Sequence, residues 1–562
     1  MGVDTAVLVV GAGPVGVMAA ILLRRLGIDC RVVERRHTPH RAPAAHVVNA
    51  RTFEICRAAG VDMVALDAAC TPPADAGQVR WMTTLAGEEL GHLPFERQGD
   101  DVKHLTPTPL RNLSQHRFEP ILLNGLHALG GEVAWGHAWE RAEQDAAGVT
   151  SRVRDGERVY DVRSRWLLAA DGAGSPVRRS LGIEPIGPGS IQSFVMIHFE
   201  ANLRGLVGHR PAVIYWTMYP DAAGTFVAHD IDSTWVYMHP WNPERESAGD
   251  YDEERCAAIV RRALGATTIP FTIRTLSPWT MTAQVAERYR AGRVFLLGDA
   301  AHRFPPTGGL GLNTGVQDAH NLAWKLAAVE GGWAPAALCD TYECERRPVA
   351  QANAEASVRN AMRIIEVYQA LGTFGVDPDA AREAYAAALA DPAGRDRVRA
   401  AIANQAEHFD MLGLQLGFTY AGGALVPEDD DRPDTSDPVR EFVPSARAGA
   451  RVPHAWILHR ETTRSSLDLL APDRCTLITA AGGGAWIEAA ARITDVPLRG
   501  LMIGRDLTDP EGRWTALLGI EPDGAVLLRP DQHVAWRAPR ADRDPGAALR
   551  RAVDVTLGRE AA

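Results

Sequence analysis

The chain has 562 residues, of which 46% are hydrophobic and 23% are charged, and its formal charge is −11. This length exceeds what one hydrophobic core supports, so we expect two or three domains. The negative charge argues against nucleic acid or an anionic membrane as a partner, and no apolar run approaches the roughly 18 residues that span a bilayer. Seven cysteines without a CxxC pair indicate a reducing cytoplasm and predict no metal site.

The N-terminal segment has the pattern of a β-α-β unit that binds a dinucleotide. An apolar strand over Ala6–Val10 runs into three glycines with GxGxxG spacing, and a helix is expected over Val17–Leu26. The first glycine permits a tight turn, the second lets the backbone approach a pyrophosphate, and the third lets helix and strand pack closely. A second strand, Arg31–Val33, ends at Glu34, which is placed to bind an adenosine ribose. The pattern does not say which dinucleotide is bound.

Two later segments also place polar residues after an apolar strand. Arg165–Ala170 leads into Asp171–Arg178 (DGAGSPVR), which by itself indicates only a turn, because Asp-Gly is a common turn dipeptide. Val294–Leu297 leads to Gly298 and Asp299, and then to a loop with two prolines and three glycines whose backbone can pass close to something flat. Asn313 or Thr314 can cap the next helix, whose positive end would stabilise a ligand that gains negative charge.

In order and spacing, these three segments resemble the FAD-dependent aromatic hydroxylases, the class A flavoprotein monooxygenases, over roughly residues 1–400. Within that family the chain is most similar to phenol and chlorophenol hydroxylases and to hydroxylases of aromatic polyketides. The resemblance implies an α/β fold with a Rossmann-type FAD-binding domain, an inserted antiparallel β-sheet substrate domain and a C-terminal thioredoxin-like domain. The last domain is indicated by Arg451–His454, Asp473–Thr476 and Gly524–Arg537. Because it holds one cysteine, Cys475, we interpret it as structural or as an assembly surface.

The resemblance also implies domain boundaries. The FAD-binding domain would be discontinuous, and the segments between its parts would form the substrate-binding sheet. The expected divisions are residues 1–75, 106–185 and 283–400 for FAD, 76–105 and 186–282 for the substrate, 401–435 as a linker and 436–562 as the C-terminal domain.

FAD is implied as a tightly bound, non-covalent cofactor. The residues that the resemblance places at FAD are Gly11, Gly13, Pro14, Gly16, Glu34, Arg35, Arg41, Arg111, Gln115, Asp171, Asp299, Pro306, Gly309, Gly311, Leu312 and Asn313.

Their implied roles follow the length of the cofactor. The first glycines would face the pyrophosphate, Glu34 and Arg35 the adenosine, Arg41 the phosphates and Asp299 the ribityl hydroxyls. Arg111 and Gln115 would lie near the ribityl chain or the pyrophosphate, Gly309–Asn313 would lie under the flavin N1–C2=O edge, and Asp171 with Arg178 would contact both FAD and NAD(P)H. The alternative is that Arg41 and Arg111 are solvated surface residues and that Gln115 begins a helix without a ligand.

The stretch from 191 to 282 alternates apolar and polar residues and is rich in aromatics, which predicts antiparallel strands. In the family such a sheet covers the substrate above the flavin, and inward aromatic rings would suit a flat substrate. His46 is the first candidate base for a phenolic hydroxyl, and a tyrosine of this sheet, such as Tyr215 or Tyr237, is the second. The alternative is that the tyrosines are sheet core and that His46 is bonded to the backbone.

The implied activity is hydroxylation of a phenolic or polyketide-type aromatic with NADPH or NADH and O₂, through a flavin C4a-hydroperoxide. The expected partners are a small aromatic substrate and O₂, with neither nucleic acid nor membrane, and a homodimer is compatible with the sequence. Two alternatives stay open: Baeyer–Villiger-type oxygenation on the same fold, and a flavin-fold protein that binds without oxygenating. A flavin halogenase is disfavoured because no Trp-x-Trp-x-Ile-Pro element is present. The substrate itself, and the choice between the two coenzymes, cannot be read from the sequence.

Overall fold

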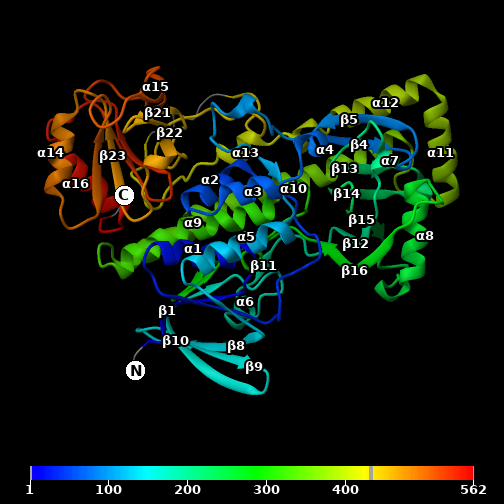
Figure 1. Ribbon diagram of the computed structural model, residues 1–562, viewed down its shortest axis with the longest axis horizontal. Coiled ribbons are helices and arrows are strands. Elements are labelled where there is room, and N and C mark those ends of the chain that lie inside the picture. Colours follow the sequence, from blue (N-terminus) through cyan, green and yellow to red (C-terminus); the bar gives the residue numbers. More distant parts are fainter. Residues whose placement is uncertain (1–2, 429–434, 561–562) are drawn as a thin grey trace.

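A computed structural model describes residues 3–428 and 435–560, and it has three parts (Figure 1). The central part is built on an eight-stranded sheet. A seven-stranded sheet lies on one side of it, and the C-terminal domain lies on the opposite side. The mixed α/β fold agrees with the fold class predicted from the sequence.

The central sheet brings the ends of its parallel strands to one edge. Its order is β18-β19-β10-β1-β2-β7, and β9 and β8 extend it from β10. β1 is parallel to both β10 and β2, and β10 is parallel to β19. The strands are β1 Thr5–Val10, β2 Cys30–Glu34, β7 Val133–Trp135, β8 His137–Gln144, β9 Val149–Asp155, β10 Arg158–Ala169, β18 Arg290–Ala291 and β19 Val294–Leu296. The turns after β1, β10 and β19 therefore meet, as expected of parallel strands.

Helices cover this sheet and bury its apolar residues. Every residue of β1 is buried, and most of α1 is buried with it. The helices of the central part are α1 Pro14–Arg25, α2 Ala50–Ala58, α3 Met63–Ala69, α5 Gln115–Ala128, α6 Pro176–Ser180, α9 Leu310–Glu330 and α10 Thr341–Ala370. Small strands join the cavity loops: β3 Val47–Val48 pairs with β6 Arg111–Asn112, and β17 Gln284–Ala286 pairs with β11 Pro185–Ile186 and β20 His302–Arg303.

The seven-stranded sheet combines the two predicted substrate segments. Its order is β16-β12-β15-β14-β13-β4-β5, and its neighbours are antiparallel except for β13 and β4, which are parallel. The predicted antiparallel sheet is therefore confirmed for all but one pair. The strands are β4 Gln78–Met82, β5 Glu89–Pro94, β12 Gln192–Glu200, β13 Ile214–Thr217, β14 Gly224–Asp230, β15 Thr234–Trp241 and β16 Thr272–Met281, with α4 Pro73–Ala76, α7 Arg204–Val207 and α8 Glu253–Leu264 beside them.

Two segments near the predicted domain boundaries have packing or structure that the sequence did not indicate. Helices α11 (Pro378–Ala390) and α12 (Pro392–Ala403), expected in the FAD-binding domain, pack on the seven-stranded sheet, because Val398 and Ile402 share an apolar cluster with Trp81. The expected linker 401–435 is also more than a linker, since it forms the short helix α13 (Leu412–Leu416) and a helical turn before it. The acidic stretch after Glu428 lies outside the described residues.

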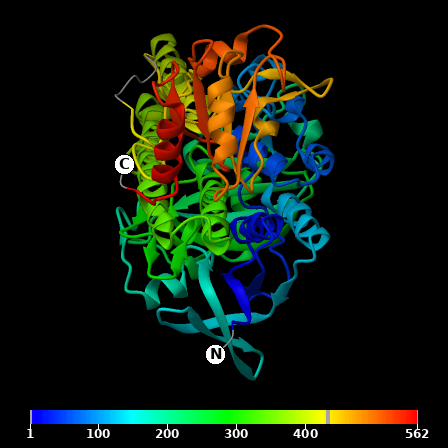
Figure 2. The ribbon, with the colours of Figure 1, turned by 90° about the vertical axis from the view of Figure 1, so that its left-hand side faces the viewer.

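The C-terminal domain has its own four-stranded sheet, of order β24-β23-β25-β26, seen in front in Figure 2. β23 and β24 are parallel and the other pairs are antiparallel. The elements are the hairpin β21 Trp456–His459 and β22 Thr462–Ser465, the strands β23 Cys475–Thr479, β24 Leu498–Met502, β25 Ala525–Leu528 and β26 Val534–Ala538, and the helices α14 Gly484–Arg492, α15 Arg513–Leu518 and α16 Pro545–Thr556. Cys475, the single cysteine of the domain, is buried.

Candidate functional site

A cavity of about 960 Å³ begins where β1, β2, β10 and β19 end, and it continues to the seven-stranded sheet. One half of its lining is made of glycines, backbone groups and carboxylates. The other half is made mainly of aromatic and aliphatic side chains. All three segments that the sequence singled out contribute to the first half.

The glycine-rich turn after β1 has no room for larger residues at two of its glycines. Gly11 has φ +104°, and a Cβ there would lie 2.2 Å from the carbonyl oxygen of Ala170. A Cβ on Gly16 would lie 2.0 Å from the carbonyl oxygen of Gly11. Gly13 and Pro14 line the cavity at the N-terminus of α1, whereas Gly16 does not line it. Gly16 therefore has the role in close packing of α1 that the sequence predicted for the third glycine, and its contact with the cofactor stays a prediction.

Glu34 and Arg35 line the cavity at the end of β2. The Glu34 carboxylate accepts hydrogen bonds of 2.9 Å from the backbone N–H groups of Ala12 and Arg36. Burial alone would raise the pKa of Glu34, but these bonds and the Arg36 guanidinium at 3.1 Å outweigh it, so the pKa is lowered. Arg36, which the sequence analysis did not select, also lines the cavity.

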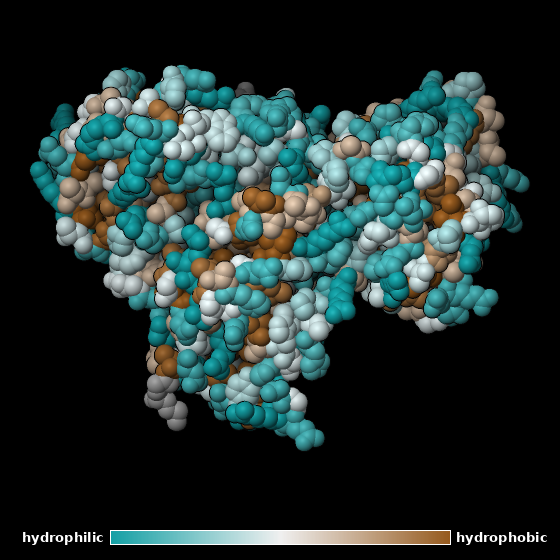
Figure 3. Space-filling model, viewed as in Figure 1, coloured by the Kyte–Doolittle hydropathy of each residue, from teal (hydrophilic) through white to brown (hydrophobic). Residues whose placement is uncertain are grey.

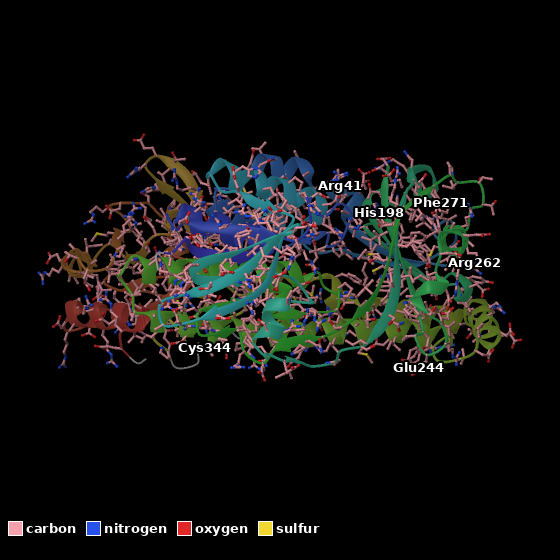
Figure 4. All side chains as sticks on the ribbon, turned by 90° about the horizontal axis from the view of Figure 1, so that it is seen from below. Arg41, His198, Glu244, Arg262, Phe271 and Cys344 are labelled. Carbon is pink, nitrogen blue, oxygen red and sulfur yellow. The ribbon has the colours of Figure 1, made fainter. Side chains whose placement is uncertain are left out.

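Two predicted arginines lie outside the cavity lining. Arg41 is exposed, and Figure 4 shows where it lies in the chain. Arg111 is half-buried and donates to the carbonyl oxygen of Gln98, with Asp67 at 3.9 Å. These positions favour the alternative that both arginines are surface residues, and their contacts with the cofactor stay predictions. Gln115 does line the cavity, and its amide donates to Glu119 at 2.7 Å.

The turn after β10 is tied to the turn after β19. The guanidinium of Arg178 donates to the carbonyl oxygen of Ala300 at 3.0 Å. Asp171 lines the cavity and accepts from the Val177 N–H at 3.1 Å through Oδ2, while its buried Oδ1 has no hydrogen-bond partner in the described part of the chain. Burial raises the pKa of Asp171. A buried carboxyl oxygen without a partner at a cavity wall indicates that a ligand completes its hydrogen bonding.

Asp299 faces the cavity directly after β19. Asp299 is exposed where it lines the cavity. The surrounding protein raises its pKa by burial, and His302 and Arg303 oppose that effect. Pro306 and Gly309 line the loop that follows.

Helix α9 begins earlier than the sequence indicated. Gly309 is its N-cap, in the left-handed conformation with φ +62°, so the predicted capping by Asn313 or Thr314 is wrong. Gly311 and Leu312 consequently lie in the first turn, where backbone N–H groups are free, and both line the cavity. Asn313 does not line it. Its amide accepts from the Asn49 N–H at 2.9 Å and donates to the Val47 carbonyl at 3.0 Å, which joins α9 to the segment that carries His46.

The seven-stranded sheet presents one face to the cavity, and the predicted tyrosines lie on the other face. Trp216, Met238 and Trp279 line the cavity. Tyr215 and Tyr237 are buried in the apolar cluster under α8. Their hydroxyls donate to the carbonyl oxygens of Arg210 at 2.9 Å and Ala222 at 3.0 Å. The prediction that either tyrosine touches the substrate is therefore wrong, because neighbouring residues of a strand point to opposite faces.

His46 lines the aromatic half of the cavity, and a chain of two amides determines which ring nitrogen carries its proton. The Gln98 amide nitrogen donates to the carbonyl oxygens of Ala76 and Phe95, both at 2.9 Å, so its oxygen is turned toward Asn112. The Asn112 amide nitrogen donates to that oxygen at 3.2 Å, which turns its own oxygen toward Nδ1 of His46 at 3.1 Å.

Nδ1 of His46 must therefore carry the proton, and Nε2 is left as the acceptor. Burial lowers the pKa of His46, opposed in part by the bond to Asn112, so the ring is neutral at neutral pH. Neither Gln98 nor Asn112 was selected by the sequence analysis, because only their contacts in the fold distinguish them from other amides.

A second histidine lies beside His46. The rings of His46 and His229 are edge-to-face with centroids 5.8 Å apart, and His229 Nδ1 lies 2.6 Å from the Ser114 hydroxyl. Burial, together with His46 and other neighbouring histidines, lowers the pKa of His229 well below its usual value. Two neutral imidazoles therefore stand at the same cavity wall.

Two family models match the chain. An FAD-binding domain model matches residues 4–357, and an aromatic-ring hydroxylase C-terminal model matches residues 445–560. The chain belongs to the FAD-dependent aromatic-ring hydroxylases. This hydroxylase is 37% identical over 95% of its length to a putative polyketide hydroxylase of Streptomyces halstedii, of which 93% is covered. It is 34% identical over 99% of its length to 2,4-dichlorophenol 6-monooxygenase of Delftia acidovorans, of which 98% is covered.

The hydroxylase also resembles a solved structure along its whole length. The flavin-dependent monooxygenase PieE, crystallised with FAD and substrate, superimposes with a TM-score of 0.92 at 36% identity, with 100% of each chain covered. The family, the monooxygenase class and the FAD cofactor predicted from the sequence are confirmed. In the described part of the hydroxylase, no helix is both long and apolar enough to cross a membrane. The face seen in Figure 3 is mostly hydrophilic, with apolar side chains gathered near its centre.

Proposed function

We propose that this hydroxylase inserts one oxygen atom of O₂ into a phenolic or polyketide-type aromatic ring at the expense of NADPH or NADH. The observation that carries the proposal is that one cavity joins the glycine- and carboxylate-lined half to the aromatic half at His46. The whole-length similarity to a polyketide hydroxylase and a dichlorophenol monooxygenase supports both substrate classes.

FAD would occupy the half of the cavity at the strand ends. The pyrophosphate would lie against Gly11, Gly13 and Pro14 at the positive end of α1, with Glu34 and Arg35 at the adenosine. Asp299 would accept hydrogen bonds from the ribityl hydroxyls. Asp171 and Gln115 would line the site beside this part of the cofactor. The remaining contacts, under the flavin ring, would come from Pro306, Gly309, Gly311 and Leu312.

Two features of the cavity fit FAD: free backbone N–H groups for the flavin ring, and carboxylates that can accept hydrogen bonds from the cofactor's hydroxyls. The first turn of α9 offers free N–H groups to the flavin edge that becomes negative on reduction. Asp171 and Asp299 both line the cavity as possible acceptors, and Oδ1 of Asp171 is buried without a donor among the described residues. When bound, FAD supplies the redox chemistry: it accepts a hydride from NAD(P)H and activates O₂.

The protein's own contribution centres on His46. Its Nε2 would accept the proton of a phenolic hydroxyl, because the ring is neutral and Asn112 holds the proton on Nδ1. Removing that proton increases the electron density of the ring that is to be oxygenated. The apolar sheet face, with Trp216 and Trp279, would hold the substrate flat and exclude water.

The finer architecture and location are part of the proposal. The parallel strands with a glycine turn before α1 support a Rossmann-type FAD-binding domain. The mixed four-stranded sheet, with α14 and α16 packed together on one of its faces, supports a thioredoxin-like domain. A structural role fits this domain, since burial raises the pKa of its Cys475 to about 12. All seven cysteines are free, which supports a reducing compartment such as the cytoplasm.

The test is oxidation of NADPH and NADH by the purified, FAD-loaded protein with a panel of phenols, naphthols and hydroxyanthraquinones. We expect oxidation to accelerate with some members of the panel, and the product to gain one oxygen on an aromatic carbon by mass spectrometry and NMR. His46→Gln should lower kcat by about 10²–10⁴-fold, the usual contribution of a general base. A ring-opened or lactone product would show that the reaction is Baeyer–Villiger oxygenation and not hydroxylation. Ligand binding without any flavin reduction would contradict a catalytic function.

A further inference from the structure

Glu96 is a carboxylic acid in the otherwise aromatic half of the cavity. It directly follows Phe95, whose ring lies 6.2 Å from those of His46 and Phe409, centroid to centroid. Phe95, Glu96 and Phe409 all line the cavity. Neither FAD binding nor the proton transfer to His46 uses this carboxyl, so its presence in an apolar wall needs a separate explanation.

The backbone of Glu96 is in the left-handed region, with φ +54°, which few residues other than glycine adopt. Its N–H donates to the carbonyl oxygen of Phe409 at 2.6 Å. This bond fixes the strained residue against the opposite segment of the cavity wall. Strain of this kind is retained where the surrounding structure demands one side-chain direction.

Only one oxygen of the Glu96 carboxyl accepts hydrogen bonds from the described residues. Oε2 accepts from the backbone N–H of Met411 at 3.2 Å and from the amide of Gln415 at 3.1 Å. Oε1 accepts no hydrogen bond from any residue that the structure describes. The carboxyl is thus anchored by one oxygen and has its other oxygen free at the cavity wall. A polar atom in such surroundings is costly unless a ligand supplies its partner.

The charged neighbours of Glu96 are already paired. Asp410 is bound by Arg97 through two contacts of 3.0 Å, and Arg440 approaches it at 3.3 Å. His408, on the same segment, is held neutral because burial lowers its pKa to about 3, and His46 across the wall is neutral as well. Burial, helped by Asp410, raises the pKa of Glu96 to about 7. Among the residues that the structure describes, the nearby Arg97 and Arg440 are both bound to Asp410, and no cation is hydrogen-bonded to the free oxygen when the carboxyl ionises.

We propose that Glu96 orients the substrate by accepting, through Oε1, a hydrogen bond from a second hydroxyl group of the aromatic ring system whose first hydroxyl faces His46. This assignment rests on the proposed function and narrows it. A substrate with a single hydroxyl, such as a simple phenol or chlorophenol, leaves Glu96 without a partner. The structure thus favours polyhydroxylated fused-ring aromatics over simple phenols.

The test compares ligands that differ in one hydroxyl. 1-Naphthol and the dihydroxynaphthalene isomers are titrated into the FAD-loaded protein at pH 6 and pH 8, and the flavin absorbance change gives each Kd. In the wild type at pH 8 we expect at least one diol to bind about ten- to hundredfold more tightly than 1-naphthol, the worth of one hydrogen bond to a charged group. Binding of that diol should tighten by up to about tenfold from pH 6 to pH 8, because the anion is the better acceptor.

Two variants distinguish orientation from a structural role. Glu96→Leu should abolish the preference for the diol and leave the Kd of 1-naphthol within about twofold. Glu96→Gln keeps an amide oxygen for Met411 and Gln415, so it should fold normally while losing the pH dependence. If Glu96→Leu fails to retain FAD, the loss or retention of the pH dependence of diol binding in Glu96→Gln alone tests the role of Glu96.

Three outcomes would overturn the assignment. Equal affinity for 1-naphthol and every diol would remove the role of Glu96 and leave the proposed function standing. A diol preference that persists in either variant, with its pH dependence unchanged, would assign the second hydroxyl to another residue. If no naphthol changes the flavin spectrum, the aromatic cavity is not a substrate site, and the proposed function fails together with the assignment.

Discussion

Arg529 and Glu345 form a bidentate ion pair in which both N···O distances are 2.8 Å and both side chains are fully buried. Arg529 belongs to the C-terminal domain and Glu345 to α10. Lys325 of α9 donates to the same carboxylate at 2.8 Å. A buried network of charges thus connects the C-terminal domain to α9, the helix that begins at the cavity.

Breaking this pair from one side should destabilise the whole protein. Glu345→Gln leaves Arg529 and Lys325 buried without their counter-charge, and we expect a loss of about 3–5 kcal/mol in the free energy of unfolding. Urea denaturation of the FAD-loaded protein measures this loss. The exposed Arg399→Gln, which breaks only a surface contact with Asp396, is the control and should change stability by less than about 0.5 kcal/mol. Equal stability of the two variants would contradict a structural role for the network.

The same pair should govern the response to acid. Burial alone would raise the pKa of Glu345, but Arg529 and Lys325 outweigh it and lower the pKa to about 2. Because the folded pKa lies below the unfolded value, the ionised carboxyl stabilises the fold above about pH 4.5, and this contribution is lost as the pH falls toward 2. It amounts to about 3 kcal/mol. Unfolding followed between pH 7 and pH 3 should therefore show a steeper loss of stability for the wild type than for Glu345→Gln.

Asn112→Asp should move the pH dependence of catalysis. A carboxylate beside Nδ1 raises the pKa of His46, so the acid limb of the kcat/KM profile should shift upward by about one pH unit. Gln98 cannot turn to relieve the change, because its amide nitrogen is bound to two backbone carbonyls. Asn112→Leu, which removes the acceptor without adding charge, should lower kcat without raising the position of the limb. An unchanged limb in Asn112→Asp would show that His46 does not titrate in the reaction.

Two glycines of the first turn should separate folding from cofactor binding. Gly16→Ala forces the backbone at Gly11 to shift, and we expect the apoprotein to lose about 1–3 kcal/mol of stability. A Cβ on Gly13 meets no protein atom within 4 Å, so Gly13→Ala should leave the apoprotein stable and weaken FAD binding by at least about tenfold. Denaturant unfolding of apoprotein and FAD titration distinguish the two effects. A stable Gly16→Ala apoprotein would contradict the packing role.

The half of the cavity that is lined by glycines and carboxylates could be predicted from the sequence, because its residues follow buried parallel strands. Once Gly11, Asp171 and Asp299 were placed directly after such strands, the geometry of a parallel sheet required them to meet. Arg41 and Arg111 could not be placed in this way, since long side chains on loops have many partners within reach. Asn313 was assigned to the flavin from its motif, yet its amide is used to join α9 to the His46 segment.

The aromatic half was less predictable, for a reason that lies in strand geometry. Tyr215 and Trp216 are adjacent, and a shift of one residue in register exchanges which of them faces the cavity. Alternation in the sequence shows that one face is covered but not which one. Glu96, Gln98 and Asn112 are ordinary residues in the sequence, and only contacts between distant segments give them a role.

The segment that lines the cavity with His408 and Phe409 continues through α13 directly into the chain that leads to the C-terminal domain. A chimera that exchanges the C-terminal third of two such hydroxylases near residue 400 would therefore transplant the anchor of Glu96 together with the new domain. The substrate preference of the chimera would then depend partly on the hydroxylase that supplied the C-terminal third. Every cofactor contact proposed above would still come from the hydroxylase that supplied the rest of the chain. The crossover point that keeps the recipient's preference lies after Gln415.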